Sequence, residues 1–181
     1  MRIGCDIASI AAVAEVESAG AGFLPDGRVK ILYEPHIFAR YSGGRFSTSH
    51  PNISRRYRLT SGQYGSYSAQ WDKFTRASAL DYRAAVYACS WGKFQLMGFN
   101  HAICGYPTLE DWVTAMSMSE GEHLQAFVGF VLKRGLADEL RYHDWTGFAY
   151  GYNGPAFDTQ DYDGKLAAAY AAAAQTYCGS A

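Results

Sequence analysis

The first helical pattern in the chain runs from Asp6 to Ser18, where apolar residues recur at intervals of three and four positions. This spacing places the carboxyl of Glu17 on the same face as the apolar residues Ile7, Ile10, Val13 and Ala14. Glu15 is rotated roughly 200° away from that face, so we expect its carboxylate to lie in solvent. The pattern therefore predicts one helix with an acidic side chain at the C-terminal end of its apolar face.

Two interpretations of Glu17 follow from this position. Removing a carboxyl from water disfavours its charged form and raises its pKa, which would let Glu17 donate a proton near neutral pH. Alternatively, the side chain extends past the helix end into water, as charged residues usually do. Ala19-Gly20-Ala21-Gly22 is expected to end the helix, so in either case the Glu17 carboxyl faces a loop.

The rest of the pattern indicates a short strand, a long loop and several helices. The segment from Arg28 to Glu34 alternates after the turn signal Pro25-Asp26-Gly27, and we interpret it as a strand or hairpin. Residues 41–68 are rich in Ser, Gly, Tyr and Arg without periodicity, which is typical of a loop flanking a cleft. Helices are predicted at about residues 69–88, 109–117, 120–134, 136–142, 144–152 and 163–177. The predicted class is mainly α (α+β), with a small hairpin or sheet after the first helix.

Length and hydropathy narrow the class of protein. The 181 residues predict a single domain over residues 1–181, with one hydrophobic core. Mean hydropathy is slightly negative, and no apolar run approaches the roughly 20 residues of a transmembrane helix, so no membrane span is expected. Asp6, Glu15 and Glu17 interrupt the apolar N-terminal stretch, which argues against a signal peptide. A monomer is the default expectation.

Charge is distributed unevenly along the chain. The 16 basic and 17 acidic residues nearly balance, but residues 35–71 contain no Asp or Glu and carry five arginines, Arg40, Arg45, Arg55, Arg56 and Arg58. This segment either attracts an anionic polymer or is ordinary solvated surface. Nucleic acid is not expected as a partner, because the overall charge is not basic and no nucleic-acid-binding motif is present.

The cysteines do not predict a metal site or a particular disulfide. Cys5, Cys89, Cys104 and Cys178 show no CxxC spacing and no His at zinc-finger distance, so neither a metal nor another cofactor is expected. They permit three pairings, and buried free thiols are an equal alternative. A serine hydrolase is disfavoured because the chain lacks a Gly-x-Ser-x-Gly motif, and no particular His is linked to a cysteine nucleophile.

Polar and aromatic residues concentrate in four turn-like segments at helix or strand ends: Glu17-Ser18, Tyr33 to His36, Ser90 to Gln95, and Tyr150 to Pro155. Cleavage of a polysaccharide needs a proton donor, a second group that stabilises positive charge or activates water, and polar groups that orient the sugars. Glu17 is the candidate donor and Glu34 the candidate second carboxylate. The candidate substrate-binding residues are Ser90, Gln95, Tyr152, Asn153 and His36. Each has a structural alternative: Glu34 as a surface residue at a strand end, Gln95 as a tie between loops, Tyr152-Asn153 as a helix cap.

The order and the amino-acid sequences of these segments resemble those of the N-acetylmuramidase domain family of phage and bacterial endolysins, over most of the chain. The residues that carry the resemblance are Val16-Glu17-Ser18, Gly22 to Arg28, Ile31 to Glu34, His36 to Phe38, Ser90-Trp91-Gly92, Phe94-Gln95, Met97 to Asn100, and Tyr152 to Pro155. More distantly, Glu17-Ser18 is similar to the Glu-Ser helix end of soluble lytic transglycosylases and goose-type lysozymes. The segment from Gly92 to Gln95 is similar to their Gly-Leu-Met-Gln turn, except that Lys93 replaces an apolar residue.

This resemblance implies a lysozyme-like fold with Glu17 as the catalytic acid. It also implies cleavage of the β-1,4 bond between N-acetylmuramic acid and N-acetylglucosamine in peptidoglycan glycan strands, in phage lysis or cell-wall remodelling. We accordingly expect synthesis in the host cytoplasm without a signal peptide, and action on the cell wall after release. The resemblance does not settle the second catalytic group, so Glu34 is a prediction from its place after the first helix.

Three alternatives remain open from the sequence. A separation of about 6.5 to 9.5 Å between the Glu17 and Glu34 carboxyls would indicate an inverting hydrolase, and about 5 to 5.5 Å a retaining one. If no second carboxylate approaches, the muramic 6-hydroxyl can attack internally, as in a lytic transglycosylase that gives anhydromuramic products. The third alternative is a non-catalytic peptidoglycan-binding module. Glu17 argues against a pure binder, because an unpaired charge on an apolar face costs stability.

Overall fold

Helices dominate the structure, a computed structural model that describes residues 3–60, 62–154 and 161–177. In chain order the helices are α1 (Ile7–Ser18), α2 (Pro35–Tyr41), α3 (Tyr67–Leu80), α4 (Tyr82–Tyr87), the short 3-10 helix η1 (Gly98–Asn100), α5 (Leu109–Met118), α6 (Glu120–Arg134), α7 (Ala137–Tyr142), α8 (Trp145–Asn153) and α9 (Tyr162–Tyr177). The strands are β1 (Ile31–Tyr33), β2 (Cys89–Trp91) and β3 (Leu96–Met97). The predicted fold class, mainly helical with a small sheet, is confirmed.

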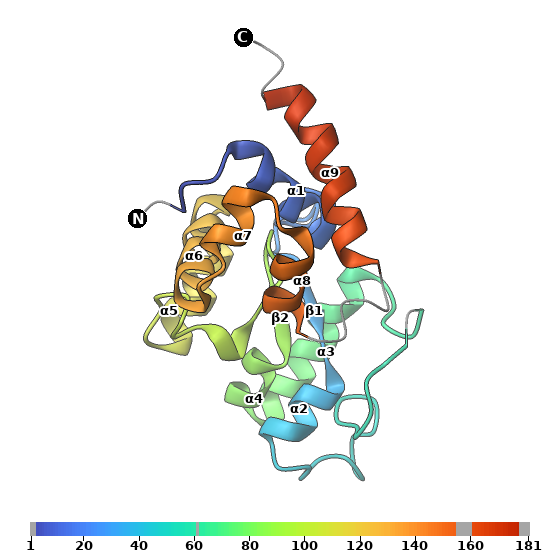
Figure 1. Cartoon of the computed structure of the whole chain (residues 1–181). Helices are drawn as coiled ribbons and strands as arrows, with labels where there is room; N and C mark the ends of the chain where they lie inside the picture. The colour runs from blue at the N-terminus through green and yellow to red at the C-terminus, as the bar shows by residue number, and fades with distance from the viewer. Residues whose placement is uncertain (1–2, 61, 155–160, 178–181) are drawn as a thin grey trace.

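The sheet lies between two groups of helices (Figure 1). In that view α1 and α9 lie near the top, where α9 packs along α1, and α2, α3 and α4 lie below the sheet. The strands are antiparallel in the order β1-β2-β3, with Ile31 opposite Trp91 and Ser90 opposite Met97. The Ser90-to-Gln95 segment, which the sequence pattern indicated only as a turn, thus comprises the end of β2 and the turn of a β-hairpin.

Small side chains form the buried face of α1. Asp6 caps the helix by accepting a 2.7 Å hydrogen bond from the Ser9 N–H, and Ala19 ends it in the left-handed region at φ 52°. The buried residues are Ala8, Ser9, Ala12, Val13, Ala14 and Ser18, whereas Ile7 is 67% exposed. The predicted apolar face is therefore wrong at Ile7, which precedes the part of the helix that meets the core. Glu15 is exposed, as the spacing predicted.

Two helix predictions needed correction. The single helix predicted over residues 69–88 is divided into α3 and α4 at Asp81, whose extended backbone interrupts the helix and whose Oδ1 accepts a 3.0 Å bond from the Ala84 N–H. The sequence pattern also missed α2. Pro35 marked the end of a strand in that pattern, but proline equally suits the first position of a helix, where no N–H is needed.

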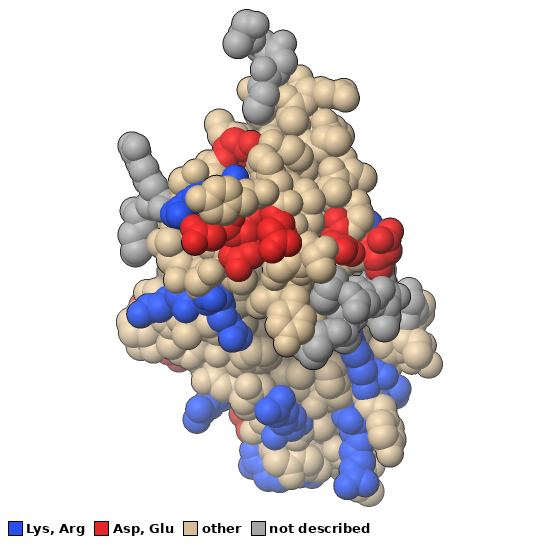
Figure 2. Space-filling view, in the orientation of Figure 1, with Lys and Arg blue, Asp and Glu red and all other residues tan. Residues whose placement is uncertain are grey.

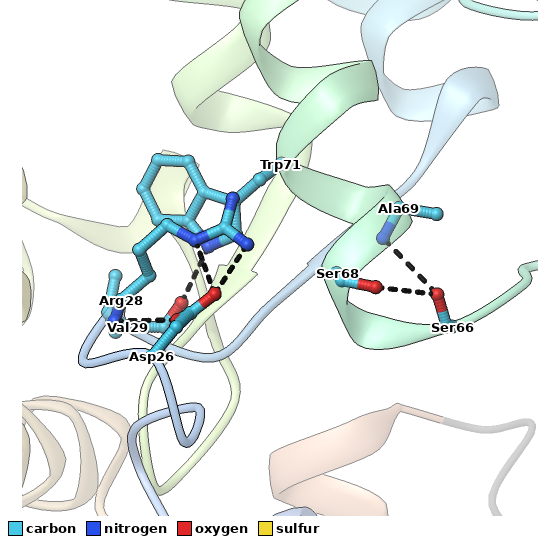
Figure 3. Close-up of polar contacts among 7 residues, drawn as sticks. All are labelled: Asp26, Arg28, Val29, Ser66, Ser68, Ala69 and Trp71. Carbon is cyan, nitrogen blue, oxygen red and sulfur yellow. Dashed lines mark hydrogen bonds and ion pairs between the residues drawn. The ribbon is translucent and has the colours of Figure 1, made fainter.

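Trp71 ties α3 to the segment that precedes β1 (Figure 3). Its indole N–H donates a 2.9 Å hydrogen bond to the Val29 carbonyl, and the Arg28 guanidinium lies 5.8 Å from the centre of its ring. Asp26 holds that guanidinium at 2.6 Å, and Ser66 caps the first turn of α3. These contacts fix the start of α3, and with it Tyr67, beside the sheet.

Residues 42–66 form the predicted loop, without helix or strand among those described. The loop is nevertheless anchored in the core: Ile53 is fully buried, and its carbonyl accepts a 2.9 Å hydrogen bond from the Tyr33 hydroxyl. Tyr33 belongs to β1, so the loop is attached directly to the sheet.

His123 joins α6 to the β2–β3 hairpin. Its Nε2 lies 2.7 Å from the Met116 carbonyl, and its Nδ1 accepts a 3.1 Å bond from the Lys93 N–H, which fixes a neutral tautomer. A Cβ at Gly92 would lie 2.8 Å from this ring, and Gly92 has φ +69°, so the turn requires glycine there. Lys93, which departs from the related turn, places its ammonium 2.6 Å from Glu120 on α6.

In the described ranges, no helix combines the length and the apolar character needed to cross a membrane. Cys5, Cys89 and Cys104 are free thiols, and Cys178 lies outside the described residues. Burial raises the pKa of each of these three thiols, so none of them is poised as a nucleophile. Among residues 3–60, 62–154 and 161–177, no group of three or more His, Cys, Asp or Glu side chains could hold a metal ion.

Candidate active site

A cleft of about 800 Å³ runs beside the sheet. Its walls come from the end of α1, the β1–α2 junction, the β2–β3 hairpin, η1, the end of α6, the end of α8 and the start of α9. The structure brings every candidate site residue into this cleft: Glu17, Glu34, His36, Ser90, Gln95, Tyr152 and Asn153. Segments separated by more than a hundred positions in sequence therefore meet in one cavity.

Glu17 lies in the last turn of α1 and is half-buried. Desolvation raises the pKa of its carboxyl to about 8, so the group is mostly protonated at neutral pH. The carboxyl also lines the cleft, where a bound ligand can reach it. A protonated carboxyl at a cleft wall is the arrangement that a general acid requires.

Tyr162, at the start of α9, is a cleft residue that the sequence analysis missed. Its hydroxyl donates a hydrogen bond to Oε1 of Glu17, although the two residues are 145 positions apart. The contact exists because α9 packs along α1. No short-range pattern marks Tyr162, which lies just outside the helix predicted over residues 163–177.

Glu34 directly follows β1 and is the N-cap residue of α2. Its side chain makes no capping hydrogen bond, so the carboxyl is free to face the cleft, and the residue is only 6% exposed. The Tyr64 hydroxyl donates a 2.7 Å hydrogen bond to Oε2. Nδ1 of His36 lies 3.3 Å from the same oxygen, but without hydrogen-bond geometry. Burial lowers the pKa of His36, which favours a neutral ring beside the carboxylate.

Basic groups surround the Glu34–Tyr64 pair. A hydrogen bond with Tyr64 and the nearby Glu34 charge raise the pKa of Arg58, which also lines the cleft. The Lys73 ammonium donates a 2.5 Å bond to the Tyr64 carbonyl. Burial first, and then the bond to Glu34, raise the pKa of Tyr64 to about 12, so its phenol remains a donor. Hydrogen-bond donors and basic groups thus surround the Glu34 side chain, whereas the carboxyl of Glu17 is desolvated.

The amide of Gln95 holds the β2–β3 hairpin together. Its Oε1 accepts a 2.7 Å bond from the Ser90 hydroxyl, while its Nε2 donates to the carbonyls of Gly92 at 2.8 Å and Lys30 at 3.4 Å. The residue itself has φ 46°, in the left-handed region. Of the two roles considered for Gln95, the geometry supports a structural tie between loops. Ser90 and Gln95 nevertheless both line the cleft.

Tyr152 forms a rigid wall near Glu17. Its hydroxyl donates a 2.7 Å bond to the Phe94 carbonyl, and its ring stacks on Phe148 with centroids 5.1 Å apart. Burial, and secondarily the Glu17 carboxyl, raise the pKa of Tyr152 well above its usual range. Asn153, the last residue of α8, is exposed in the cleft and is the freer of the two to meet a ligand.

Two comparisons with known proteins match most of the chain. The N-acetylmuramidase family matches residues 6–174. The crystal structure of a Burkholderia AP3 phage endolysin is similar at 40% sequence identity and a TM-score of 0.81, over 96% of this chain and 67% of that chain. Among curated proteins, none matches the chain. The family match confirms the resemblance seen in the sequence. The chain therefore belongs to the N-acetylmuramidase family of peptidoglycan hydrolases.

Proposed function

We propose that the chain hydrolyses the β-1,4 bond between N-acetylmuramic acid and N-acetylglucosamine, with Glu17 as the general acid. The observation that carries this proposal is the half-buried Glu17 carboxyl at the cleft wall, whose pKa is raised to about 8. At neutral pH such a group holds a proton that it can transfer to the departing glycosidic oxygen. Tyr162 orients the carboxyl for that transfer.

Glu34 is the proposed second catalytic group. Held by Tyr64 and nearly buried, its carboxylate can accept a proton from a water molecule or stabilise the positive charge that develops on the sugar. His36, Ser90, Gln95, Tyr152 and Asn153 form the proposed substrate-binding wall. Asn153 supplies a free amide, whereas Gln95 and Tyr152 contribute shape because their polar groups are bonded within the protein.

A second candidate reaction is the lytic transglycosylase reaction, in which the muramic 6-hydroxyl replaces water and an anhydromuramic product forms. Glu34 in the same cleft as Glu17 favours hydrolysis, because a second carboxylate can activate water. Mass spectrometry of the released muropeptides separates the two reactions. We expect reducing-end muramic acid to dominate, and a majority of products lacking one water would establish the transglycosylase instead.

The third candidate, a binding module without catalysis, is tested with Glu17→Gln and a matched control. Glu15→Gln makes the same change on the exposed face of the same helix. We expect Glu17→Gln to abolish release of soluble fragments from purified peptidoglycan while it still sediments with the insoluble polymer. Glu15→Gln should act like the parent, and equal turnover by the Glu17 variant would refute the acid role.

We propose that the biological role is host lysis by a phage endolysin that acts as a monomer, and that residues 1–181 form a single catalytic domain. The similarity to a phage endolysin over 96% of the chain supports this role. Synthesis in the host cytoplasm and release to the cell wall follow from it as part of the proposal. Lysis of outer-membrane-permeabilised cells, compared with Glu17→Gln, tests the role, and size-exclusion chromatography tests the monomer.

A further inference from the structure

Three aromatic side chains gather at the margin of the cleft: Tyr41 at the end of α2, Tyr87 at the end of α4, and Phe99 in η1. The ring of Tyr41 meets that of Tyr87 edge-on with centroids 4.8 Å apart, and its centroid lies 5.8 Å from that of Phe99. Tyr41 is 41% exposed, whereas the other two rings are half-buried. The cluster therefore supports one exposed tyrosine ring on two fixed neighbours.

This cluster is continuous with the cleft. Phe99 lines the cleft and also contacts Tyr41. Ile37 lines the cleft from α2, and Tyr41 lies four positions later, on the same face of that helix. A polymer that leaves the cleft past Ile37 and Phe99 meets Tyr41 next.

Two arginines border the cluster. The Arg40 guanidinium lies 5.9 Å from the Tyr41 ring centre, and that of Arg83 lies 5.2 Å from the Tyr87 ring centre. Both are exposed, and neither forms an ion pair with a carboxylate in the described ranges, whereas nearby Arg45 pairs with Asp81 at 2.5 Å. Lys and Arg side chains also predominate on the half of the molecule that holds α2, α3 and α4, while acidic residues gather on the other half of the face shown (Figure 2).

We propose that Tyr41, with Arg40 and Arg83, forms a distal subsite that binds the glycan strand of peptidoglycan beyond the catalytic cleft; this inference rests on the proposed function. The apolar face of a sugar ring packs on an exposed tyrosine, and Phe99 and Tyr87 hold that ring in place. The guanidinium groups meet the carboxylates of the peptides carried by each muramic acid. A carbohydrate polymer with regularly spaced carboxylates matches both parts of the surface.

The subsite contacts sugars that do not react. It therefore stabilises the bound substrate and the transition state to the same extent, which lowers KM without raising kcat. For a substrate of only two disaccharide units, few sugars extend beyond the cleaved bond, so the subsite contributes little. This difference between long and short substrates separates distal binding from a role in chemistry.

Tyr41→Ala and the double variant Arg40→Gln with Arg83→Gln test the proposal. With intact peptidoglycan we expect KM to rise roughly threefold to tenfold in each, which is the range for one aromatic or cation contact. Values of kcat, and kcat/KM for the two-disaccharide fragment, should stay unchanged. The matched controls are Tyr142→Ala and Arg56→Gln. Tyr142, on α7, is 80% exposed, Arg56 is also exposed, and neither residue lines the cleft.

Sedimentation with insoluble peptidoglycan in a Glu17→Gln background provides a second measurement that needs no turnover. Bound protein should fall when Tyr41→Ala is added and remain constant when Tyr142→Ala is added. Parental KM and parental sedimentation in both subsite variants would overturn the subsite while leaving the hydrolase intact. A parent chain that releases no fragments would instead refute the proposed function. If Tyr41→Ala lowers the melting temperature, the surface arginine variant decides the outcome.

Discussion

The hydroxyl of Tyr162 donates a hydrogen bond to Oε1 of Glu17, so the first residue of α9 holds the proposed acid at the end of α1. The contact spans 145 positions of sequence. It gives the C-terminal helix a direct part in the site, since α9 covers α1 and supplies the donor to its carboxyl.

Tyr162→Phe removes this donor and keeps the ring. We expect kcat to fall between about tenfold and a hundredfold, because a misplaced acid transfers its proton less readily. The pKa of Glu17 should rise further, since a donated hydrogen bond favours the charged carboxylate. The kcat–pH profile checks both effects. An unchanged kcat, together with an unmoved alkaline limb, would reduce Tyr162 to a packing residue.

The alkaline limb of the activity profile should report the ionisation of Glu17. Its carboxyl has a pKa of about 8 and must carry a proton to act, so kcat/KM should fall as the pH rises through about 8. Initial rates on peptidoglycan between pH 5 and 10 in buffers of constant ionic strength measure this limb. The exposed Glu15→Gln should have the same profile as the parent. Activity that persists undiminished well above pH 8 would argue against a protonated Glu17.

Glu34→Gln tests the second carboxylate. We expect turnover to fall roughly a hundredfold to ten-thousandfold, the usual range for loss of acid–base assistance. Tyr64→Phe, which removes the 2.7 Å hydrogen bond to Glu34 together with the side-chain hydrogen bond between Tyr64 and Arg58, should cause a smaller fall. Rates are measured with the same peptidoglycan preparation for all three proteins. Parental rates in Glu34→Gln would assign this side chain a structural role at the start of α2.

The sequence predicted elements that carry their own signals. Thr108 and Ser119 each accept a hydrogen bond from the N–H three residues later, and α5 and α6 begin at the residues after them, as predicted. The helix interruption at Asp81 was missed, because its side chain caps α4 in a stretch whose helical periodicity continues on both sides. Where one residue both ends and starts a helix, periodicity alone cannot place the boundary.

The candidate site was predictable where polar residues occupy turns, and not where contacts join distant segments. Glu17, Glu34 and Gln95 each lie at the end of an element or in a turn, which is visible in the sequence. Tyr64 and Tyr162 contact the two carboxylates from a long loop and from the last helix, and neither has a distinguishing local pattern. Packing of α9 on α1 decides the second contact, and periodicity does not report which helices pack together.

Glu17→Gln should stabilise the protein at neutral and alkaline pH. The pKa of Glu17 is about 8 in the folded chain and 4.5 in the unfolded chain. Between these pH values the Glu17 carboxyl is therefore ionised in the unfolded chain and protonated in the folded chain. Ionisation then favours unfolding by up to about 1.4 kcal/mol for each pH unit in that window. The stability that Glu17→Gln gains over the parent should be absent below pH 4.5 and complete above about pH 8. Urea unfolding of the variant and Glu15→Gln checks this, and a variant less stable than the parent at pH 8 would contradict it.

His123 should make the fold sensitive to acid. Both ring nitrogens are hydrogen-bonded in the neutral state: Nε2 donates to the Met116 carbonyl, and Nδ1 accepts from the Lys93 N–H. Burial lowers the pKa of the ring. The charged groups that face it are Glu120, Lys93 and Glu122. The unfolded chain takes up a proton at about pH 6.5 and the folded chain only at lower pH, so stability should fall as the pH drops below 6.5.

The melting temperature measured from pH 5 to 8, together with the NMR titration of the His123 ring, checks this coupling. His123→Gln is the informative variant, because it keeps polar groups at the site but cannot titrate in this range. It should be less stable than the parent at pH 8, where it disturbs the contact with the β2–β3 hairpin, and the difference should narrow towards pH 5. A difference that stays constant over the whole range would show that protonation of His123 is not what destabilises the parent in acid.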